Sequence, residues 1–490
     1  MMRRDLPVLE GEILVIGSGA GGAVTAATLA ETGHDVLVLE EGPVVGREGA
    51  RTNSPEAMQS LYRQAGMSPL LGPHPIAFVE GRCVGGSTEI NAGFWSHLPR
   101  EVARRWQVQN GIREFDPTFL DQLREEIEKV VEPCKLESGD PAPSSRLFRQ
   151  GLDGVGASYG EVPRVCASRA NPFEPGAKRS MSRTFLPRAV AAGARLRAGA
   201  RAIRLLHHAG RVSMVLAEIR EGDVAYRVKV VPEHVFLCAG AIQTPALLRR
   251  SGIRRAVGAS LYTHPMLKIA AEFEQAVDAD QGSLPIYQLR ADGGELVCGG
   301  SAFSPGLLAM TLAESGCLGG ELMDRWRRMA LYYVSCRGTG RGRVWAVPYT
   351  GEALATYRCS AADHRRLLGG LDQLCRVLFA AGARRLFAAV DGSAPLESAT
   401  QIPALLDLAS RDRRMSLSAV HVFGSCPMGE QPERCPTDSF GRLRGFQNLW
   451  VSDASILPDA PGVNPQSVVM TLALRNARRF AAGGGLHGSR

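Results

Sequence analysis

Apolar residues near the start of the chain mark a buried strand, a helix and a second buried strand. Residues 12–16 read Glu-Ile-Leu-Val-Ile and residues 35–39 read Asp-Val-Leu-Val-Leu, with a glycine-rich turn and an apolar helix between them. Short apolar runs of this kind are typical of parallel strands that are buried on both faces. The unit at about residues 12–42 therefore predicts a dinucleotide-binding β-α-β motif.

The turn in this unit has the chemistry of a pyrophosphate site. Gly17, Ser18, Gly19 and Gly22 let the backbone approach the anion closely, and the helix that follows presents unpaired N–H groups to it. Glu40 ends the second strand 18 residues after Gly22, near the ~20 expected of a carboxylate that accepts hydrogen bonds from a ribose. The unit alone does not distinguish a flavin dinucleotide from a nicotinamide dinucleotide.

The pattern of strand, glycine turn and helix returns at residues 235–245, so the dinucleotide domain is discontinuous. Residues 266–350 differ, because strand-like segments flank Gly-Thr-Gly-Arg-Gly and indicate antiparallel hairpins. We predict an α/β fold with a doubly wound, Rossmann-like dinucleotide domain and a second, substrate-facing α+β domain on an antiparallel sheet. The first domain is assigned residues 1–115, 186–265 and 406–490, and the second residues 116–185 and 266–405.

A second glycine-rich segment covers residues 81–93. It contains four glycines in thirteen residues, among them Gly85 and Gly86, and ends with Asn91-Ala92-Gly93. Such a density of glycine argues against a regular helix and suits a backbone pressed against a planar or anionic group. A plain glycine-rich loop is the alternative on these residues alone.

Composition and charge exclude several classes of protein. The chain has 490 residues, a net charge of +8 and 57 basic residues, but these are scattered and form no run typical of a nucleic-acid surface. Eleven cysteines without a C-x-x-C pair indicate neither a disulfide framework nor a zinc site, and no histidine and carboxylate cluster has metal spacing. No apolar run of ~18 residues predicts a membrane span or secretory signal, so a cytoplasmic location is expected.

Two segments near the end of the chain carry candidate chemistry. His421 begins His-Val-Phe-Gly-Ser-Cys-Pro-Met-Gly, a loop that contains two glycines. A strand at 448–452 ends in Asp453-Ala454-Ser455, and Asn464-Pro465 precedes the last helix. Imidazole titrates near working pH and can accept and release a proton in each turnover, although an isolated histidine is more often structural.

Together these segments resemble the glucose–methanol–choline (GMC) family of flavin oxidoreductases, nearly end to end. The resemblance implies FAD. The matching segments, in chain order, are the first β-α-β unit, Gly85-Gly86-Ser87-Thr88 with Asn91, Gly240-Ala241-Ile242 with Pro245, Ser251-Gly252-Ile253, His264-Pro265, His421 and Asn464-Pro465.

The family's cofactor residues carry over to this chain position by position. In the adenosine half, the pyrophosphate would lie against Gly17, Ser18, Gly19 and Gly22, the ribose against Glu40, and the adenine against the backbone of Ala202. The flavin and its diphosphate would lie against Gly85, Gly86 and Asn91. The ribityl and phosphate region would lie against Asp453 and Ala454, and the flavin ring against Asn464 and Pro465. Members with a covalent flavin have a histidine before the asparagine of the Gly-Gly segment. Ile90 stands there in this chain, so we expect non-covalent FAD.

The resemblance implies that a small-molecule alcohol is oxidised to a carbonyl, with hydride transfer to flavin N5. His421 would be the general base, or would stabilise the developing alkoxide, and Asn464 would hold the same hydroxyl; His264 is expected to be structural. Residues 170–178 depart from the cysteine- and glycine-rich stretch of long-chain and secondary alcohol oxidisers, which weakens any transfer of their substrates.

Three alternatives use the same residues differently. A non-redox lyase of the cyanohydrin type would need the histidine but no flavin reduction. A flavoprotein without activity would not need both His421 and Asn464, and a nicotinamide enzyme would leave the Gly85-Gly86 segment and the C-terminal segments without a role. The sequence leaves the substrate, the electron acceptor (oxygen or another) and the oligomeric state open.

Overall fold

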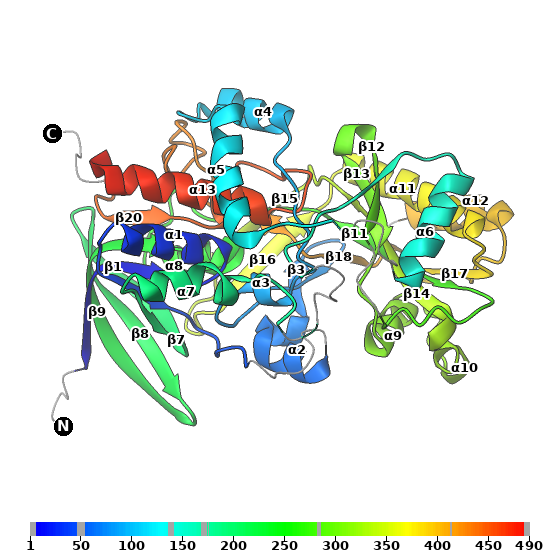
Figure 1. Cartoon of the computed structure of the whole chain (residues 1–490), viewed down its shortest axis with the longest axis horizontal. Coiled ribbons are helices and arrows are strands. Elements are labelled where there is room, and N and C mark those ends of the chain that lie inside the picture. The colour runs from blue at the N-terminus through cyan, green and yellow to red at the C-terminus, as the bar shows by residue number, and fades with distance from the viewer. Residues whose placement is uncertain are drawn as a thin grey trace.

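Two β-sheets, each covered by its own helices, occupy opposite sides of the molecule in Figure 1. The structure, a computed structural model, describes residues 6–46, 54–135, 142–167, 174, 176–281, 286–411 and 414–484. Within those ranges the first sheet has seven strands and the second has eleven. A separate two-stranded ladder pairs β10 (Tyr262–Thr263) with β19 (Val422–Phe423).

The first sheet is built around the predicted β-α-β unit. β1 (Val8–Ile16) pairs in parallel with β2 (Val36–Leu39) on one side and with β9 (Val224–Leu237) on the other. β6 (Arg195–Arg197) extends the sheet beyond β2, and β20 (Leu449–Val451) pairs in parallel with the end of β9. Four segments distant in sequence therefore form one parallel sheet, which confirms the discontinuous Rossmann-like domain.

The first half of β9 belongs to an antiparallel ribbon. β8 (Arg211–Glu221) pairs with β9 and also with β7 (Ala200–His208). The ribbon projects at the lower left of Figure 1. Its β7 end returns to the parallel sheet, because the Ala200 N–H donates to the Glu40 carbonyl oxygen at 2.8 Å.

Apolar helices cover both faces of the first sheet. One core places Ile13 and Val15 of β1 against α1, α5, α7 and α13, and the other places Leu14 and Ile16 against α4 and α8. The helices are α1 (Ala20–Glu31), α4 (Arg100–Asn110), α5 (Pro117–Val131), α7 (Phe185–Ala191), α8 (Gly240–Arg250) and α13 (Gln466–Arg479).

The second sheet is mostly antiparallel, as predicted. Its strands lie side by side in the order β15 (Arg341–Ala346), β16 (Ala353–Arg358), β3 (Ser68–Leu71), β4 (Ile76–Phe78), β18 (Leu417–Ala419), β11 (Met266–Glu272), β14 (Met329–Cys336), β13 (Leu296–Gly300), β12 (Tyr287–Ala291) and β5 (Tyr159–Glu161), with β17 (Arg385–Ala388) also beside β11.

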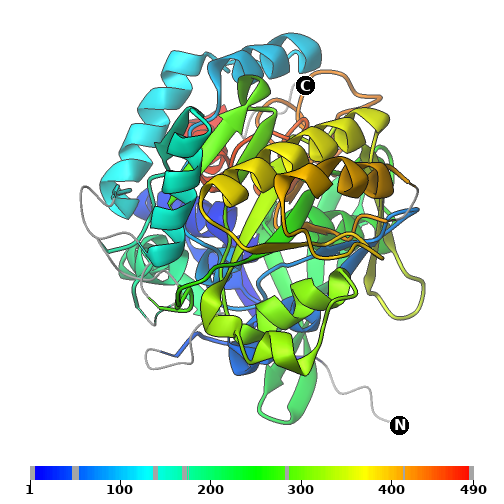
Figure 2. The same cartoon turned by 90° about the vertical axis from the view of Figure 1, so that its right-hand side faces the viewer.

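Different helices cover the two faces of this sheet (Figure 2). Leu267 and Ile269 of β11 pack with α11 and α6 on one face of the sheet. Because side chains alternate along a strand, Ala270 lies on the other face and packs with α9. The Asp363 carboxylate and the Ser360 hydroxyl form a capping box at the start of α11. The helices are α6 (Pro143–Gly154), α9 (Pro305–Glu314), α10 (Gly320–Met323), α11 (Ala361–Ala380) and α12 (Ile402–Ser410).

Several strands and one helix belong to a different domain from the one that the predicted boundaries assign to them. The predicted boundaries assign β3, β4 and β18 to the dinucleotide domain, but these strands pair within the second sheet. α5 was placed with the substrate domain, but its buried residues pack against the first sheet. Local periodicity identifies a strand or a helix without identifying its partner, and the partner decides the domain.

Two short helices flank the glycine-rich segment at 81–93. α2 (Pro55–Leu61) precedes it, and α3 (Ser87–Ile90) makes one turn inside it, where only a loop was expected. No helix of the part of the chain that the structure describes is long and apolar enough to cross a membrane. Across the same ranges, no group of three histidine, cysteine or acidic side chains is arranged to hold a metal ion.

Candidate active site

Two histidines from distant parts of the chain meet at the ladder of β10 and β19. The register pairs Thr263 with Val422, and the Thr263 hydroxyl donates to the His421 carbonyl oxygen at 2.6 Å. His264 and His421 continue the two strands, and their Nδ1 atoms lie 3.1 Å apart. The pairing of two short strands therefore places both imidazoles in contact.

The backbone favours one tautomer of the buried His264. The Gly462 N–H donates to His264 Nε2 at 3.2 Å, so a neutral His264 carries its own proton on Nδ1. In that tautomer His264 donates to His421 Nδ1, and His421 carries its proton on Nε2. In the opposite tautomer His421 donates from Nδ1 and leaves Nε2 free to accept.

Asn464 faces the other side of the His421 ring. Its Nδ2 atom lies 3.4 Å from His421 Nε2, and its Oδ1 atom accepts a hydrogen bond from the Ser96 hydroxyl at 3.3 Å. Asn464 immediately precedes Pro465, the residue before the first turn of α13. A rigid helix end therefore holds the amide against the imidazole.

Burial keeps both imidazoles neutral near pH 7. Desolvation lowers the pKa of His421 to about 4. Desolvation is also the main cause that lowers the pKa of His264 well below its ordinary value, and the neighbouring His421, Arg337 and Arg290 lower it further. Both rings are therefore unprotonated at one nitrogen near pH 7, which is the state that a proton acceptor requires.

The two glycine-rich segments meet backbone to backbone. A Cβ on Gly86 would lie 2.9 Å from Gly19 Cα, and a Cβ on Gly22 would lie 1.9 Å from the Gly17 carbonyl oxygen. α1 begins after Gly19 without a side-chain cap and without an acidic residue in its first turn. Its first N–H groups are available to an anion, so these residues fit the pyrophosphate of a dinucleotide.

The Glu40 carboxylate holds the glycine turn through hydrogen bonds. It accepts hydrogen bonds from the Ser18 N–H at 3.0 Å, the Ser18 hydroxyl at 2.7 Å and the Gly42 N–H at 2.9 Å. A carboxylate has about four acceptor positions, so one remains for a ribose hydroxyl. The Gly85 N–H donates to the Ser18 hydroxyl at 3.0 Å, which joins the second glycine segment to the first.

A buried lysine and a glutamine hold the second glycine segment in place. Lys178 Nζ donates to the carbonyl oxygens of Glu89 and Asn91, each at 2.6 Å, and burial lowers the lysine pKa to about 7. The Asn91 amide donates to Gln466 Oε1 at 2.7 Å. Asn91 is therefore tied to the first turn of α13, next to Asn464.

The Asp453 side chain is fully used by the protein. Its carboxylate accepts hydrogen bonds from the Gly240 N–H at 2.9 Å, the Thr244 hydroxyl at 2.5 Å, and the N–H and hydroxyl of Ser455 at 2.8 and 2.5 Å. Four donors fill its acceptor positions. Any contact of Asp453 or the adjacent Ala454 with a cofactor would therefore come from the backbone.

Ala202 lies on β7, two residues beyond the Ala200 N–H that bonds Glu40. Its carbonyl oxygen accepts a hydrogen bond from Arg250 Nη2 at 3.0 Å, and its strand partner is Ala217. The position is next to the end of β2, as a contact with adenine requires, but the carbonyl is already engaged.

Sequence reasoning missed several side chains of this site. Ser96, Lys178 and Gln466 join the site although no sequence motif marks them, and His264, for which the sequence predicts a structural role, contacts His421. The sequence signal that could have indicated the contact is the position of His264, which directly follows a short strand whose pairing partner lies beside His421. Residues 170–173 and 175, where the chain departs from alcohol-oxidising relatives, lie outside the described residues.

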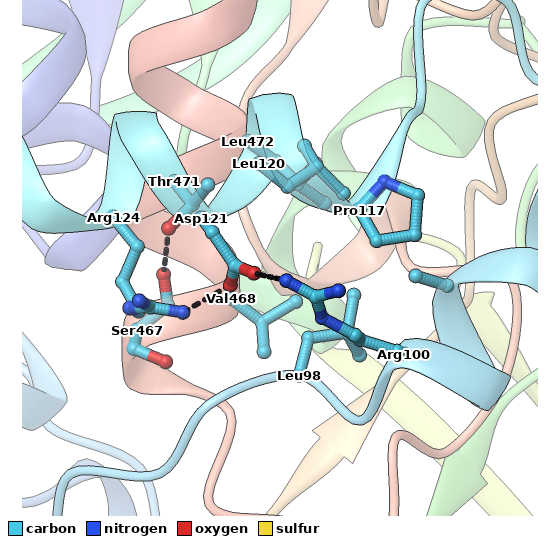
Figure 3. Close-up of a pocket in the computed structure, with 11 residues that line it drawn as sticks. Leu98, Arg100, Pro117, Leu120, Asp121, Arg124, Ser467, Val468, Thr471 and Leu472 are labelled. Carbon is cyan, nitrogen blue, oxygen red and sulfur yellow. Dashed lines mark hydrogen bonds and ion pairs between the residues drawn. The ribbon is translucent and has the colours of Figure 1, made fainter.

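A separate pocket lies between α4, α5 and α13 (Figure 3). Asp121 lies between Arg100 and Arg124 there and pairs with both. The Thr471 hydroxyl donates to the Ser467 carbonyl oxygen at 2.8 Å, so this polar group is also satisfied. The pocket contains none of the residues proposed for chemistry.

Comparison with known proteins gives the family. A family model described as GMC oxidoreductase matches residues 58–266, a second model with that description matches residues 352–473, and one described as an NAD(P)-binding Rossmann-like domain matches residues 15–62. The crystal structure of pyridoxine 4-oxidase from Mesorbium loti superposes with a TM-score of 0.73 over 98% of this chain and 100% of that chain, at 18% identity. This likeness supports the fold.

Relatives match nearly the whole chain. A GMC-type oxidoreductase of Sinorhizobium fredii is 36% identical in a match that covers 96% of this chain and 94% of the relative. A GMC-type oxidoreductase of Mycobacterium tuberculosis is 34% identical in a match that covers 98% of this chain and 78% of the relative. Long-chain-alcohol oxidase FAO3 of Arabidopsis thaliana is 27% identical in a match that covers 96% of this chain and 68% of the relative. The chain belongs to the GMC oxidoreductase family and is an FAD-dependent enzyme that acts on CH–OH groups.

Proposed function

We propose that the enzyme oxidises a small-molecule alcohol to the carbonyl compound, with His421 as the group that takes the hydroxyl proton and Asn464 as a second hydrogen-bonding partner of the same oxygen. The observation that carries this proposal is the pair itself. His421 Nε2 and Asn464 Nδ2 lie 3.4 Å apart, on segments that also contact the glycine-rich loops through Asn91 and Gln466. The name of a relative, long-chain-alcohol oxidase, agrees with an alcohol as substrate.

The proposed positions for FAD are those that the resemblance to the GMC family implies. The pyrophosphate would lie at Gly17, Ser18, Gly19 and Gly22, the adenosine ribose at Glu40 and the adenine near Ala202, and the flavin half at Gly85, Gly86, Asn91, Asp453, Ala454 and Pro465. When bound there, FAD supplies the acceptor for the hydride that leaves the alcohol carbon. The protein has to hold that carbon in position and manage the hydroxyl proton.

The proton requires a defined tautomer of the histidine pair. To accept at Nε2, His421 has to carry its own proton on Nδ1 and donate it to His264 Nδ1. The Gly462 N–H favours the opposite tautomer, with the His421 proton on Nε2, whereas the Asn464 Nδ2 donor favours an unprotonated Nε2 that can take the hydroxyl proton. Both tautomers keep His421 at the substrate oxygen, and in both His264 sets the state of the ring, so we propose His264 as a positioning residue.

FAD is proposed to be non-covalent. Ile90 occupies the position from which a histidine would bond to the flavin, and its side chain is a buried hydrocarbon without a nucleophile. Acid precipitation of the purified enzyme should release the yellow chromophore into the supernatant. A pellet that stays yellow after washing would show that another residue is bonded to the flavin.

An anaerobic substrate panel tests the proposed reaction. Alcohols of several classes are added to the enzyme without oxygen, and the flavin absorbance band is followed. Bleaching with concomitant carbonyl formation is expected for at least one alcohol. Repetition in air with peroxide detection separates oxygen from other electron acceptors. Cleavage of a cyanohydrin with an unbleached flavin would instead identify the lyase.

A further inference from the structure

The second sheet turns a polar row toward the proposed catalytic residues. Gln288, Gly299 and Tyr333 are neighbours in register on β12, β13 and β14. The Gln288 amide crosses above Gly299 and donates to the Tyr333 hydroxyl at 2.8 Å. A Cβ on Gly299 would lie 3.2 Å from that hydroxyl, so glycine leaves room for the contact.

This row lies on the face opposite the core under α11. Leu289 and Cys298, which alternate with Gln288 and Gly299 along the strands, pack in that core. Arg290 is two residues beyond Gln288 and therefore shares its face. Alternation along β12 and β13 therefore places Arg290, with Gln288 and Gly299, on the face away from that core.

Arg290 connects this row to the catalytic amide. Its Nη2 atom donates to Gln288 Oε1 at 3.2 Å and to the Ser96 hydroxyl at 3.5 Å, and the Ser96 hydroxyl donates to Asn464 Oδ1 at 3.3 Å. Two consecutive hydrogen bonds therefore separate the guanidinium from Asn464. The charge of Arg290 also reaches His264, where it lowers the imidazole pKa.

Arg290 has no acidic partner among the residues that the structure describes. Arg337, the other cation whose charge reaches His264, contrasts with it, because Arg337 pairs with Glu295 at 2.7 Å and Asp459 at 3.5 Å. Arg290 is exposed to solvent, yet its surroundings desolvate it enough to lower its pKa. A guanidinium in such a place gains most from a ligand that brings a negative charge.

Lys268 adds positive charge to the same face. It lies opposite Tyr333 in the register of β11 and β14. Desolvation lowers its pKa, the charge of Glu314 on α9 partly offsets this shift, and no ion pair of Lys268 is found within the described ranges. Around Tyr333 this face therefore offers cations and neutral hydrogen-bonding groups to a substrate, whereas its apolar residues Ala270 and Leu331 are packed under α9.

We propose that Arg290 binds an anionic group of the substrate, and that the substrate is an alcohol with a carboxylate a short distance from the carbon that is oxidised. This inference rests on the proposed oxidation of an alcohol at His421 and Asn464. A carboxylate matches the planar fork of a guanidinium and would form two parallel hydrogen bonds with it. An uncharged alcohol of the same shape leaves Arg290 without its counter-charge, so the charged molecule is selected.

Paired substrates test the inference. Each pair contains a hydroxycarboxylate and its neutral amide, namely 4-(hydroxymethyl)benzoate with 4-(hydroxymethyl)benzamide and 4-hydroxybutanoate with 4-hydroxybutanamide. The FAD-loaded wild-type enzyme should bleach faster with the carboxylate, by about 10- to 100-fold in kcat/KM. Arg290→Gln should remove this preference, and Arg290→Lys should retain part of it. Arg227→Gln is the control, because Arg227 is exposed on the β8–β9 ribbon and its loss changes the net charge equally.

A binding measurement separates this inference from the proposed reaction. 4-Methylbenzoate and 4-methylbenzamide carry no hydroxyl, and their dissociation constants are read from the change they cause in the flavin spectrum. The benzoate should bind at least roughly 10-fold more tightly to the wild type than to Arg290→Gln, while the benzamide should not distinguish them. Equal dissociation constants, or a preference for carboxylates that survives Arg290→Gln, would overturn the anion site. Selective anion binding without bleaching by any alcohol would instead overturn the proposed oxidation.

Discussion

The two sheets serve a ligand in different ways. At the end of the first sheet the backbone forms the site: Gly19 and Gly86 approach each other, and a Cβ on Gly21 would lie 1.9 Å from the Ser452 carbonyl oxygen. On the second sheet side chains form it, because Gln288 and Arg290 project from one face and reach across neighbouring strands. The first site depends on the absence of side chains, and the second depends on their identity.

Substitutions at the glycine turns and at the imidazoles should therefore impair different properties of the enzyme. Changes at the glycine turns are expected to reduce folding and cofactor content together. Changes at the imidazoles are expected to reduce turnover while FAD stays bound.

His421→Ala should retain FAD but lower turnover by roughly 10²-fold or more, the usual scale for loss of a general base. The measurements are kcat with an oxidisable alcohol and the ratio of flavin to protein absorbance. His208→Ala is a suitable control, since His208 is an exposed residue at the end of β7. Near-normal turnover of His421→Ala would remove His421 from the proposed mechanism.

Gly21→Ala should destabilise the protein by about 1–3 kcal/mol, the cost of overpacking, and should reduce its FAD content. The added methyl group collides with the Ser452 carbonyl oxygen, a backbone atom that cannot move without displacing β20. Urea unfolding and the flavin-to-protein ratio measure both effects. Gly33→Ala is the control for loss of a glycine near α1, because a Cβ there meets nothing within 4 Å, although its φ of +92° adds some backbone strain. Full FAD content in Gly21→Ala would contradict the tight contact.

Acid should destabilise the fold through His421. Its pKa is about 4 in the folded protein and about 6.5 when unfolded, so between these values the unfolded chain binds more protons and stability falls as pH falls. From pH 7 to pH 5 the wild type should lose on the order of 2 kcal/mol more than His421→Asn. Urea unfolding of both proteins at the two pH values tests this. Parallel losses would mean that His421 is not desolvated.

His264 should act through His421 rather than through the substrate. His264→Leu keeps most of the side-chain volume but removes the hydrogen bond to His421 Nδ1, so kcat should fall roughly 10-fold with little change in KM, as expected for loss of about one hydrogen bond. His264→Asn can still form a hydrogen bond and should recover part of the rate. If both variants lost only stability, His264 would have a purely structural role.

The cofactor side was largely predictable because its signals are local. Strand, glycine turn, helix and Glu40 lie within one stretch of about 30 residues. The requirement for glycine at position 21 is an exception, because it comes from the distant Ser452 carbonyl oxygen. The second sheet was predicted only as an antiparallel sheet. Arg290 meets Ser96 only because β12, β13 and β14 pair in one register, and no periodicity along a single strand encodes that register. The assignment of β3, β4 and β18 failed for the same reason.

Strand β20 fills the last position beside β9, and the Thr25 hydroxyl of α1 meets the Ser452 hydroxyl at 2.8 Å across 427 residues of chain. On a ribosome that adds 5–20 residues per second, α1 waits roughly 20–90 s for this partner. Until then the side of α1 that α13 will cover, and one edge of β9, remain exposed apolar surface. The first sheet therefore lacks this covering until synthesis is nearly complete, and the proposed FAD contacts at Asp453, Ala454 and Pro465 become available only then.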